Sequence, residues 1–345
     1  MSAIITFKPR QVTKRLLFAL SPRAKEVITN RYGLGRDVQK MTLEAIGNQY
    51  GITRERVRQI ENAALESIKK SDAFSNEAPT LNELAVAIDS LGGIISEKEL
   101  LELIAKDKNT QNHTLLLLTL GDAFNKKKED NEFRHHWYID EDLKNAINTA
   151  LKNIYGNLSK DDLISESELI NKFLNEVKDL NIKYRNEEIV KRWLSISKTL
   201  GKNPLGEWGI ANSPNVKVKG MRDYAYLAIK KNGSPMHFTE VSKAILDYFG
   251  KSAHTATCHN ELIKDQRFVL VGRGLYALSE WGYTSGVVRD VIIKILEKEE
   301  NLTRESIIDK VRKERYIKDN TITVNLQNRD YFNIDKNGRY SINKY

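Results

Sequence analysis

A short stretch near the N-terminus brings together side chains that can read the edges of bases. Residues 51–70 run GITRERVRQIENAALESIKK. Arginine pairs with guanine O6 and N7, glutamine pairs with adenine N6 and N7, and glutamate accepts from cytosine N4. At helical spacing, positions i, i+1, i+4 and i+5 share one face. The sequence therefore predicts a base-reading helix that exposes Arg54, Glu55, Arg58 and Gln59. A solvated basic face, supported by salt links along the helix, is the alternative.

Two short helices are needed to present such a face. Thr42 begins the segment TLEAIGNQY, which has Leu43 and Ile46 on one side, and a tight turn at residues 51–53 follows it. Thr53 can cap the second helix with its hydroxyl, so the pattern predicts a helix-turn-helix. Apolar residues recur at helical spacing in the second helix and are expected to face the core. They are Val57, Ile60, Ala64 and Ile68.

The positive charge of the chain is concentrated around this motif. The net charge of the 345 residues is +9, with 55 Lys and Arg against 46 Asp and Glu. Residues 1–70 hold 14 of these cations and 6 of the anions, a net +8. By counting, residues 71–218 carry −5, and residues 219–283 and 284–345 carry +3 each. A concentrated basic domain attracts the phosphate backbone through counterion release, whereas the acidic middle is expected to be repelled by DNA.

Length and composition limit the class of protein. A chain of 345 residues exceeds what one core usually fills, so two or more domains are expected. No apolar run approaches the roughly 18–20 residues that span a bilayer, and Lys and Arg interrupt the N-terminal apolar islands, unlike a secretory signal. Cys258 is the only cysteine, which excludes an intrachain disulfide framework and a Cys-rich zinc module. A soluble, cytoplasmic protein with no membrane partner is predicted.

The segment LLFALSPRAKEVITNRYGLGRDVQKMTLEAIGNQYGITRERVRQIENAALESIKK, residues 16–70, resembles region 4 of sigma-70-type RNA polymerase sigma factors. The resemblance rests on the RYGL turn and the TLEAIG and TRERVRQIE helices, in that order and at the family's spacing. It implies recognition of a minus-35-like promoter hexamer, with the four residues above at base-contacting positions. The positions that match phosphate contacts of the family are Arg23, Arg31, Thr42 and Leu43. The positions that match the part packing on the flap of the polymerase β subunit are Leu17, Leu20, Val27 and Ile28.

This resemblance is limited in two ways. Late in the recognition helix, Ala63 and Glu66 occupy positions that are usually basic in the family, so weaker backbone affinity, with help from polymerase, is expected. The resemblance covers about 55 residues, and nothing elsewhere resembles the aromatic-rich region that melts the minus-10 element. An initiating sigma factor is therefore not predicted.

The rest of the chain repeats one layout roughly every 65–75 residues, after a linker predicted at 71–80. An apolar helix leads to a residue that can cap a second helix, a third apolar segment follows, and the last two units end in hairpins. The capping residues are Ser96, Ser165, Thr239 and Thr303. We expect a mainly α fold with small β wings, in which a helix-turn-helix domain (1–72) precedes a string of winged-helix-like units. The expected units are 80–140, 141–212, 220–283 and 284–345. The alternative, chiefly for the first two units, is that the pattern reflects only the turn and capping residues common to any α+β chain.

One of these units carries a second resemblance. A leading Tyr-rich helix, the segment HFTEVSKAI and the ending RFVLVGRGLYALSEWG lie within residues 221–283. This stretch resembles a HARE-HTH domain, the winged-helix type found in the delta subunit of bacterial RNA polymerase. The resemblance implies a nucleic-acid or polymerase context without fixing the contact surface. Arg273, at the expected wing tip, is a candidate phosphate contact, and a plain turn residue is the alternative.

No catalytic constellation is evident in the sequence. His254, Cys258 and His259 fall close together, yet a zinc site needs three or four converging ligands and no partner cluster is apparent. No Gly-x-x-x-x-Gly-Lys-Ser/Thr phosphate loop occurs. The run Leu115–Leu118 is interpreted as core. We therefore expect a protein that is not an enzyme and that needs no metal, cofactor or small-molecule substrate.

Together these features predict a cytoplasmic, nucleoid-associated transcription factor of bacterial or phage type. The resemblance implies two partners, double-stranded promoter-like DNA and core RNA polymerase, the latter through its β flap. Two alternatives remain open. One is a DNA-binding regulator that acts without polymerase. The other is the DNA-recognition component of a restriction or defence system, because HARE-HTH modules also accompany such enzymes.

Overall fold

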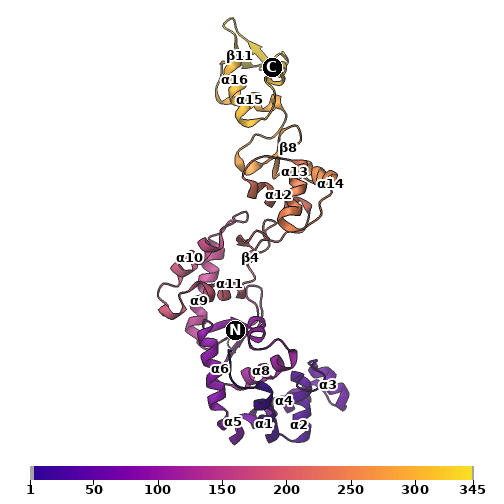
Figure 1. The fold of residues 1–345 in the computed structure, drawn as a ribbon, viewed down its shortest axis with the longest axis vertical. Helices are drawn as coiled ribbons and strands as arrows, with labels where there is room; N and C mark the ends of the chain where they lie inside the picture. The colour runs from indigo at the N-terminus through magenta and orange to yellow at the C-terminus, as the bar shows by residue number, and fades with distance from the viewer. Residues whose placement is uncertain (1–3, 344–345) are drawn as a thin grey trace. The chain divides into compact units, whose positions relative to one another are not determined.

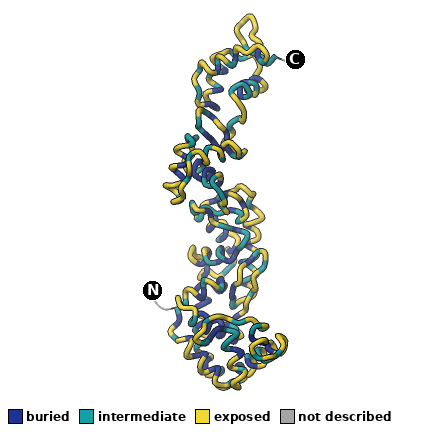
Figure 2. Tube along the Cα trace, turned by 90° about the vertical axis from the view of Figure 1, so that its right-hand side faces the viewer, coloured by how far each residue is buried: buried dark blue, intermediate teal, exposed yellow. Residues whose placement is uncertain are grey.

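The computed structural model describes residues 4–343 and divides into two compact units. The first unit ends at Gly201 and the second begins at Lys202. Both consist mainly of helices with small antiparallel sheets attached (Figure 1). Buried residues lie in the interior of each unit and exposed residues on its outside (Figure 2). The predicted fold class, mainly helical with small β wings behind an N-terminal helix-turn-helix, is confirmed.

The first unit begins with the helices of the expected helix-turn-helix. They are α1 (Pro9–Leu16), the short 3₁₀ helix η1 (Leu17–Ala19), α2 (Pro22–Tyr32), α3 (Leu43–Tyr50) and α4 (Arg54–Lys69). Ser21, Thr42 and Thr53 each accept a hydrogen bond from the backbone N–H three residues on, which fixes the starts of α2, α3 and α4. Gly33 and Gly51 end α2 and α3 at φ of 64°, a left-handed conformation that glycine adopts without strain. The chain can therefore turn sharply into the recognition helix.

The stretch 71–80, predicted as a linker, is helical instead. It forms two helices, α5 (Asp72–Asn76) and the start of α6 (Ala78–Ser90). Pro79 lies in the first turn of α6, where its missing N–H costs no helical hydrogen bond. Glu77 is buried between the two helices and accepts from Arg15 Nε at 2.6 Å. The proline and the polar residues thus mark a helix boundary within a packed body.

Three segments share the order helix, strand, two helices and two strands. In the first unit these elements are α6, β1 (Ile94–Ser96), α7 (Glu97–Ile104), α8 (Lys108–Leu120), β2 (Asn125–Lys127) and β3 (His136–Tyr138). In the second unit they are α12 (Met221–Asn232), β6 (Met236–His237), α13 (Phe238–Phe249), α14 (Thr255–Lys264), β7 (Phe268–Gly272) and β8 (Leu275–Leu278). The last set is α15 (Val288–Lys298), β9 (Leu302–Thr303), α16 (Arg304–Glu314), α17 (Asp319–Leu326), β10 (Phe332–Ile334) and β11 (Arg339–Ile342). In each sheet the last strand lies in the middle and pairs with both others, in antiparallel register.

Further helices complete the first unit. They are α9 (Glu141–Gly156), α10 (Glu166–Glu176), the 3₁₀ helix η2 (Ile182–Tyr184) and α11 (Glu187–Ile196), followed by β4 (Leu200–Lys202). Trp193 of α11 is fully buried, and its Nε1 donates to the carbonyl of Gly92 at 3.1 Å. The loop between β2 and β3 is also fixed, because Arg134 N–H donates to Ile196 O at 2.9 Å. The second unit additionally contains β5 (Trp208–Ile210) and the 3₁₀ helix η3 (Ser279–Trp281).

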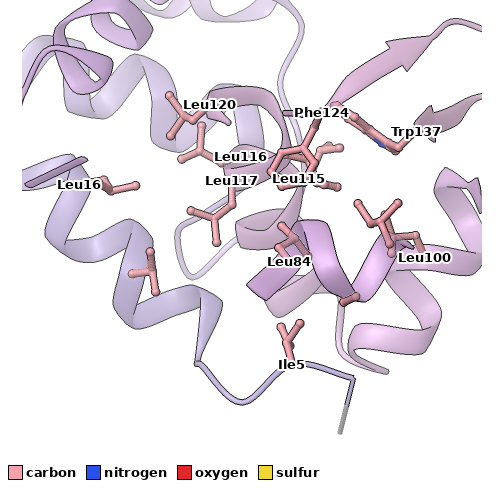
Figure 3. Packing of buried hydrophobic residues seen from close by; sticks show 14 of the residues in the cluster. Ile5, Leu16, Leu84, Leu100, Leu115, Leu116, Leu117, Leu120, Phe124 and Trp137 are labelled. Carbon is pink, nitrogen blue, oxygen red and sulfur yellow. The ribbon is translucent and has the colours of Figure 1, made fainter. Parts of the chain in front are cut away.

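The core of the first unit is built around α8. Every residue from Gln111 to Leu118 is buried. Figure 3 shows the leucines of α8 together with Leu16 of α1 and Leu84 of α6, and the same cluster contains Ile28 and Ile68 of the helix-turn-helix. The predicted core role of Leu115–Leu118 is confirmed. The helix-turn-helix therefore shares one hydrophobic core with the segment that follows it.

Polar side chains of α8 also hold the loop that connects α2 to α3. Asn112 Nδ2 donates to the carbonyl oxygens of Gly33, at 3.0 Å, and Val38, at 2.9 Å. Asn109 Nδ2 donates to the carbonyl of Gly35 at 3.3 Å. Buried backbone carbonyls are costly to leave without a partner. These bonds fix the approach of the chain to α3 and so help to orient the helix-turn-helix.

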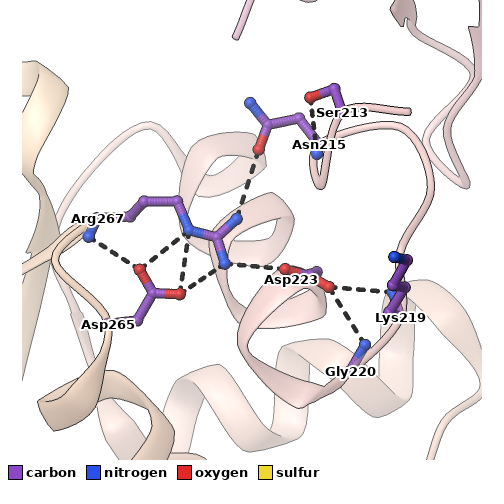
Figure 4. A network of polar contacts seen from close by, with 7 residues as sticks. All are labelled: Ser213, Asn215, Lys219, Gly220, Asp223, Asp265 and Arg267. Atoms are coloured by element: carbon purple, nitrogen blue, oxygen red, sulfur yellow. Dashed lines mark hydrogen bonds and ion pairs between the residues drawn. The ribbon is translucent and has the colours of Figure 1, made fainter. Parts of the chain in front are cut away.

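A charged network fixes the start of α12 in the second unit (Figure 4). Arg267 Nη2 donates to Asp223 at 2.8 Å and to Asp265 at 2.7 Å. The buried Asp223 carboxylate also accepts from the backbone N–H groups of Lys219 and Gly220. Several charge-assisted hydrogen bonds to one buried carboxylate hold it in a fixed position. The network ties the segment that precedes α12 to the start of β7.

Candidate nucleic-acid interface

The recognition helix α4 has a buried face and an exposed face. Val57, Ala64 and Ile68 are buried, and Ile60 is partly buried, as their spacing predicts. The four predicted base-reading residues all lie on the exposed side. They are Arg54, Glu55, Arg58 and Gln59. The structure thus brings these four together at the N-terminal half of α4, the part of a recognition helix that contacts base edges.

Two hydrogen-bonded pairs of residues organise the exposed face of α4. Glu55 accepts from Arg58 Nε at 2.9 Å and from Arg58 Nη2 at 2.7 Å. The bond from Arg58 holds the pKa of Glu55 below its ordinary value, and the same pairing raises the pKa of Arg58. Arg56 Nη1 donates to Gln59 Oε1 at 3.0 Å. These side chains are therefore arranged before any partner binds.

Arg56 is a candidate site residue that the sequence prediction missed. Its side chain lines a shallow pocket together with Arg23 of α2, Ser21 and Ile52. The pocket places a predicted phosphate-contacting arginine beside the recognition helix. The sequence signal for Arg56 was the spacing of the three arginines in TRERVR. Arg56 was not selected because it lies off the helical face that Arg54 and Arg58 share. Its position favours phosphate contact and support of Gln59.

The other predicted phosphate contacts differ in which of their atoms are available to a ligand. Arg31 is half-buried, donating from Nε to Glu61 at 3.3 Å and from Nη1 to the carbonyl of Met41 at 3.1 Å. Thr42 and Leu43 lie at the start of α3, where backbone N–H groups and the helix dipole attract anions. The Leu43 side chain packs against the small core beneath the turn. Any phosphate contact by Leu43 must therefore come from its backbone.

Most of the predicted polymerase-contacting residues face inward. Leu17, Val27 and Ile28 are buried in the first unit, whereas Leu20 is partly exposed. Phe18, which the sequence prediction passed over, is 83% exposed, and Lys25 Nζ lies 5.9 Å from its ring centre. An exposed aromatic side chain can bury a large apolar area against a partner. Leu20 and Phe18 are accessible to a partner, and the three buried residues support them from within.

The remaining candidates lie outside the helix-turn-helix. Arg273 is exposed in the turn between β7 and β8. Cys258 is buried, and burial raises the pKa of its thiol to about 11. The ring of His259 stacks on that of Phe238 at 4.2 Å. Across residues 4–343, no three His, Cys, Asp or Glu side chains gather as a metal site would require. None of the helices in this range is long and apolar enough to cross a membrane.

Comparison with known proteins defines the class of the N-terminal domain. Residues 16–70 match the family model described as Sigma-70, region 4. This segment, with the capped α3 and α4 and their exposed basic face, is a sigma-70 region 4 domain. The match ends where α4 ends, at the boundary to α5.

The relatives of this segment are RNA polymerase sigma factors. RNA polymerase sigma factor RpoD of Neisseria gonorrhoeae is 42% identical over 59 residues, which cover 17% of this chain and 9% of that protein. SigA of Nostoc sp. is 45% identical over 60 residues, covering 17% and 15%. The principal sigma factor HrdD of Streptomyces coelicolor is 38% identical over 68 residues, covering 20% of each. The chain therefore spans a fifth or less of the length of these three relatives.

Proposed function

We propose that this chain is a DNA-binding transcription factor associated with bacterial RNA polymerase, in which α4 reads a minus-35-like promoter element. One observation carries the proposal: the exposed face of α4 presents Arg54, Glu55, Arg58 and Gln59 in a segment that matches sigma-70 region 4. A helix presented in this way fits the major groove, where such side chains distinguish base pairs. The segment after residue 70 supplies a scaffold, and no promoter-melting region is assigned to it.

In this proposal the residues have separate roles. Arg58 and Gln59 contact base edges after exchanging their present partners, Glu55 and Arg56, for bases. Arg23, Thr42 and the backbone of Leu43 hold phosphates, as the N-terminus of a helix does for many anions. Arg31 contributes a phosphate contact through Nη2, which donates no hydrogen bond to residues 4–343, while its other nitrogens hold α2 to α4.

The affinity of the full chain for two duplexes tests the DNA-reading role. One duplex contains a minus-35-like hexamer and the other a scrambled sequence, and fluorescence anisotropy gives both Kd values at one fixed salt concentration. Arg58→Ala and Gln59→Ala should each lower the ratio of the Kd for the scrambled duplex to the Kd for the hexamer duplex by roughly 5- to 150-fold, since a good base contact is worth about 1–3 kcal/mol. Arg23→Ala should weaken both complexes alike and reduce the salt slope by about 1.

Lys14→Ala is the matched control, because Lys14 is an exposed cation on α1 outside the proposed interface. It should leave the ratio of the two Kd values unchanged. Equal weakening of both duplexes by Arg58→Ala and Gln59→Ala would contradict base reading by α4. Promoter binding in vivo by a variant that no longer binds core polymerase would instead favour an independent regulator.

The contact with polymerase is proposed for the surface around Phe18 and Leu20. The burial of Leu17, Val27 and Ile28 supports this choice, because only the first two side chains are accessible to the flap of the β subunit. Exposed aromatic residues are common energetic centres of protein interfaces. The flap contact therefore depends on Phe18 more than on the buried residues.

The remaining units are proposed to be winged helices. Residues 80–140, 220–283 and 284–345 share the order helix, strand, two helices and two strands, which supports this division. We propose that 141–212 is a further unit and that 220–283 is of the HARE-HTH type, the latter on the residues quoted for that resemblance. A cytoplasmic, nucleoid-associated location follows from the proposed partners.

A further inference from the structure

The four units after the N-terminal domain differ in what their third helix presents. In α8 the residues from Gln111 to Leu118 are buried, so this helix has no free face for a groove. The exposed start of α11 is acidic, with Glu187 and Glu188. On α14 the exposed face includes Ile263, whose side chain is 62% exposed. The first two of these helices therefore offer no surface with the chemistry of a DNA reader, and α14 combines the exposed Thr257 and Asn260 with the partly exposed acidic residue Glu261.

The third helix of the last unit, α17, is different. Ile322 and Leu326 are buried on one side of it. The opposite side exposes residues at positions i, i+1, i+4 and i+7, which share one helical face. They are Asn320, Thr321 and Val324 of α17 and Gln327, the residue that directly follows it. Amide and hydroxyl groups can bond to base edges, and an aliphatic group such as that of Val324 can contact a thymine methyl. The face contains no acidic residue.

Charge within this unit is segregated toward α17. Residues 310–343 contain eight Lys and Arg against four Asp and Glu, a net +4. Residues 284–309 contain four against six, a net −2. Exposed cations stand before α17, after it and on the β10–β11 hairpin. They are Lys318, Arg329, Lys336 and Arg339. A phosphate backbone is attracted to residues 310–343 and repelled by residues 284–309.

The carboxylates of Asp319 and Asp335, two of the four in residues 310–343, are occupied by groups of the chain itself. Asp319 accepts from Arg312 Nε at 2.8 Å and from Nη2 at 2.6 Å. Asp335 accepts from the backbone N–H groups of Asn337 and Arg339, both at 2.8 Å, and so shapes the hairpin turn. These carboxylates therefore repel a phosphate less than free ones would.

The turn between β7 and β8 extends the same basic surface. Tyr316 N–H donates to the carbonyl of Val271 at 2.7 Å, and Gly272 forms a bridge with Tyr316. Arg273 follows Gly272 directly and is exposed, while Lys318 lies two residues after Tyr316. Both cations thus lie next to the backbone contact between Gly272 and Tyr316, just before α17 begins.

We propose that α17 and the β10–β11 hairpin form a second binding site for double-stranded DNA. In this site α17 enters a major groove, with Asn320 and Gln327 bonding to base edges. The cations of the hairpin, together with Lys318 and Arg273, hold the flanking phosphates. The site uses residues distinct from those of α4, and it does not rest on the function proposed for α4.

Selection from a randomised duplex library with the full chain tests this second site. The unaltered chain should enrich two unrelated sequence motifs. Asn320→Ala combined with Gln327→Ala should abolish enrichment of one motif and keep the other. Arg58→Ala combined with Gln59→Ala should do the reverse. Lys336→Ala combined with Arg339→Ala should lower the salt slope of binding to the second motif by about 2.

The control is Lys294→Ala combined with Lys298→Ala, which removes the same charge from exposed positions of α15 in the acidic half. It should retain both motifs, and circular dichroism melting of each variant should show that it folds. A single motif that depends only on Arg58 and Gln59 would overturn the second site and leave the role of α4 intact. Unchanged selection by the α17 variant, with weaker binding to core polymerase, would identify a protein contact and likewise overturn the proposal.

Discussion

Arg31 is held at two points of its guanidinium group by its own chain. The bonds to Glu61 and to the carbonyl of Met41 join α2, the loop before α3 and the middle of α4. Arg23 is exposed at the start of α2 and lines only a shallow pocket. The same residue type therefore stabilises the fold at one position and is free for a ligand at the other.

This difference predicts that two substitutions affect the free energy of unfolding to different extents. Arg31→Ala should lower the free energy of unfolding by about 1 kcal/mol, because it removes two hydrogen bonds from a half-exposed charged group. Arg23→Ala should leave the free energy of unfolding unchanged within about 0.5 kcal/mol. Urea unfolding followed by circular dichroism measures both. Equal stability of the two variants would show that the Arg31 bonds do not support the fold.

At the scale of elements, α8 determines how the helix-turn-helix is held. Thr13 of α1 is hydrogen-bonded through Oγ1 to Nδ1 of His113 at 2.5 Å, and both side chains are buried. The Nε2 atom of His113 is buried without a partner among the described residues. Burial lowers the pKa of His113 to about 4, with the charge of Arg10 acting in the same direction and that of Asp107 opposing it. The imidazole in the contact between α1 and α8 therefore stays neutral down to about pH 4.

A pH-dependent stability follows from this contact. Below pH 6.5 the unfolded chain binds a proton at His113, whereas the folded chain does not until about pH 4. Stability of the first unit is therefore lost as the pH falls from 6.5 to about 4, by about 3 kcal/mol from this group. His113→Gln should reduce the difference between the unfolding free energies measured at about pH 7 and at about pH 4.5. An unchanged difference in the variant would mean that other groups carry the acid sensitivity.

Local patterns predict some of these elements well and others poorly. The caps Thr42 and Thr53 and the exposed face of α4 were predictable, since they depend on neighbours within one or two turns. The leucines of α8 were predictable as core, but not their partners, because Leu16 and Ile28 lie far away in the sequence, near the N-terminus. The same long-range packing buries Leu17 and Ile28 and turns the expected linker into helices. The α17 surface depends on which helix faces stay uncovered, and sequence spacing does not reveal this.

At the scale of the whole molecule, the region 4 domain is not an independent module. It shares a core with α6 and α8 in a unit that extends to Gly201, so its surface is shaped by residues outside the segment that matches the family model. Of the surfaces that the resemblance assigns to polymerase, Leu20 is accessible, beside the exposed Phe18. A polymerase-associated function therefore requires that the chain bind core polymerase without opening this unit.

The most direct measurement is the Kd of the full, labelled chain for purified bacterial core RNA polymerase. The account predicts a saturable complex that Phe18→Ala weakens by about tenfold or more, equivalent to about 1.4 kcal/mol or more. Val86→Ala is the matched control, because Val86 is 60% exposed on α6 of the same unit, and it should leave the Kd unchanged. Absence of binding, or equal weakening by both substitutions, would contradict association of this domain with polymerase through the Phe18 surface.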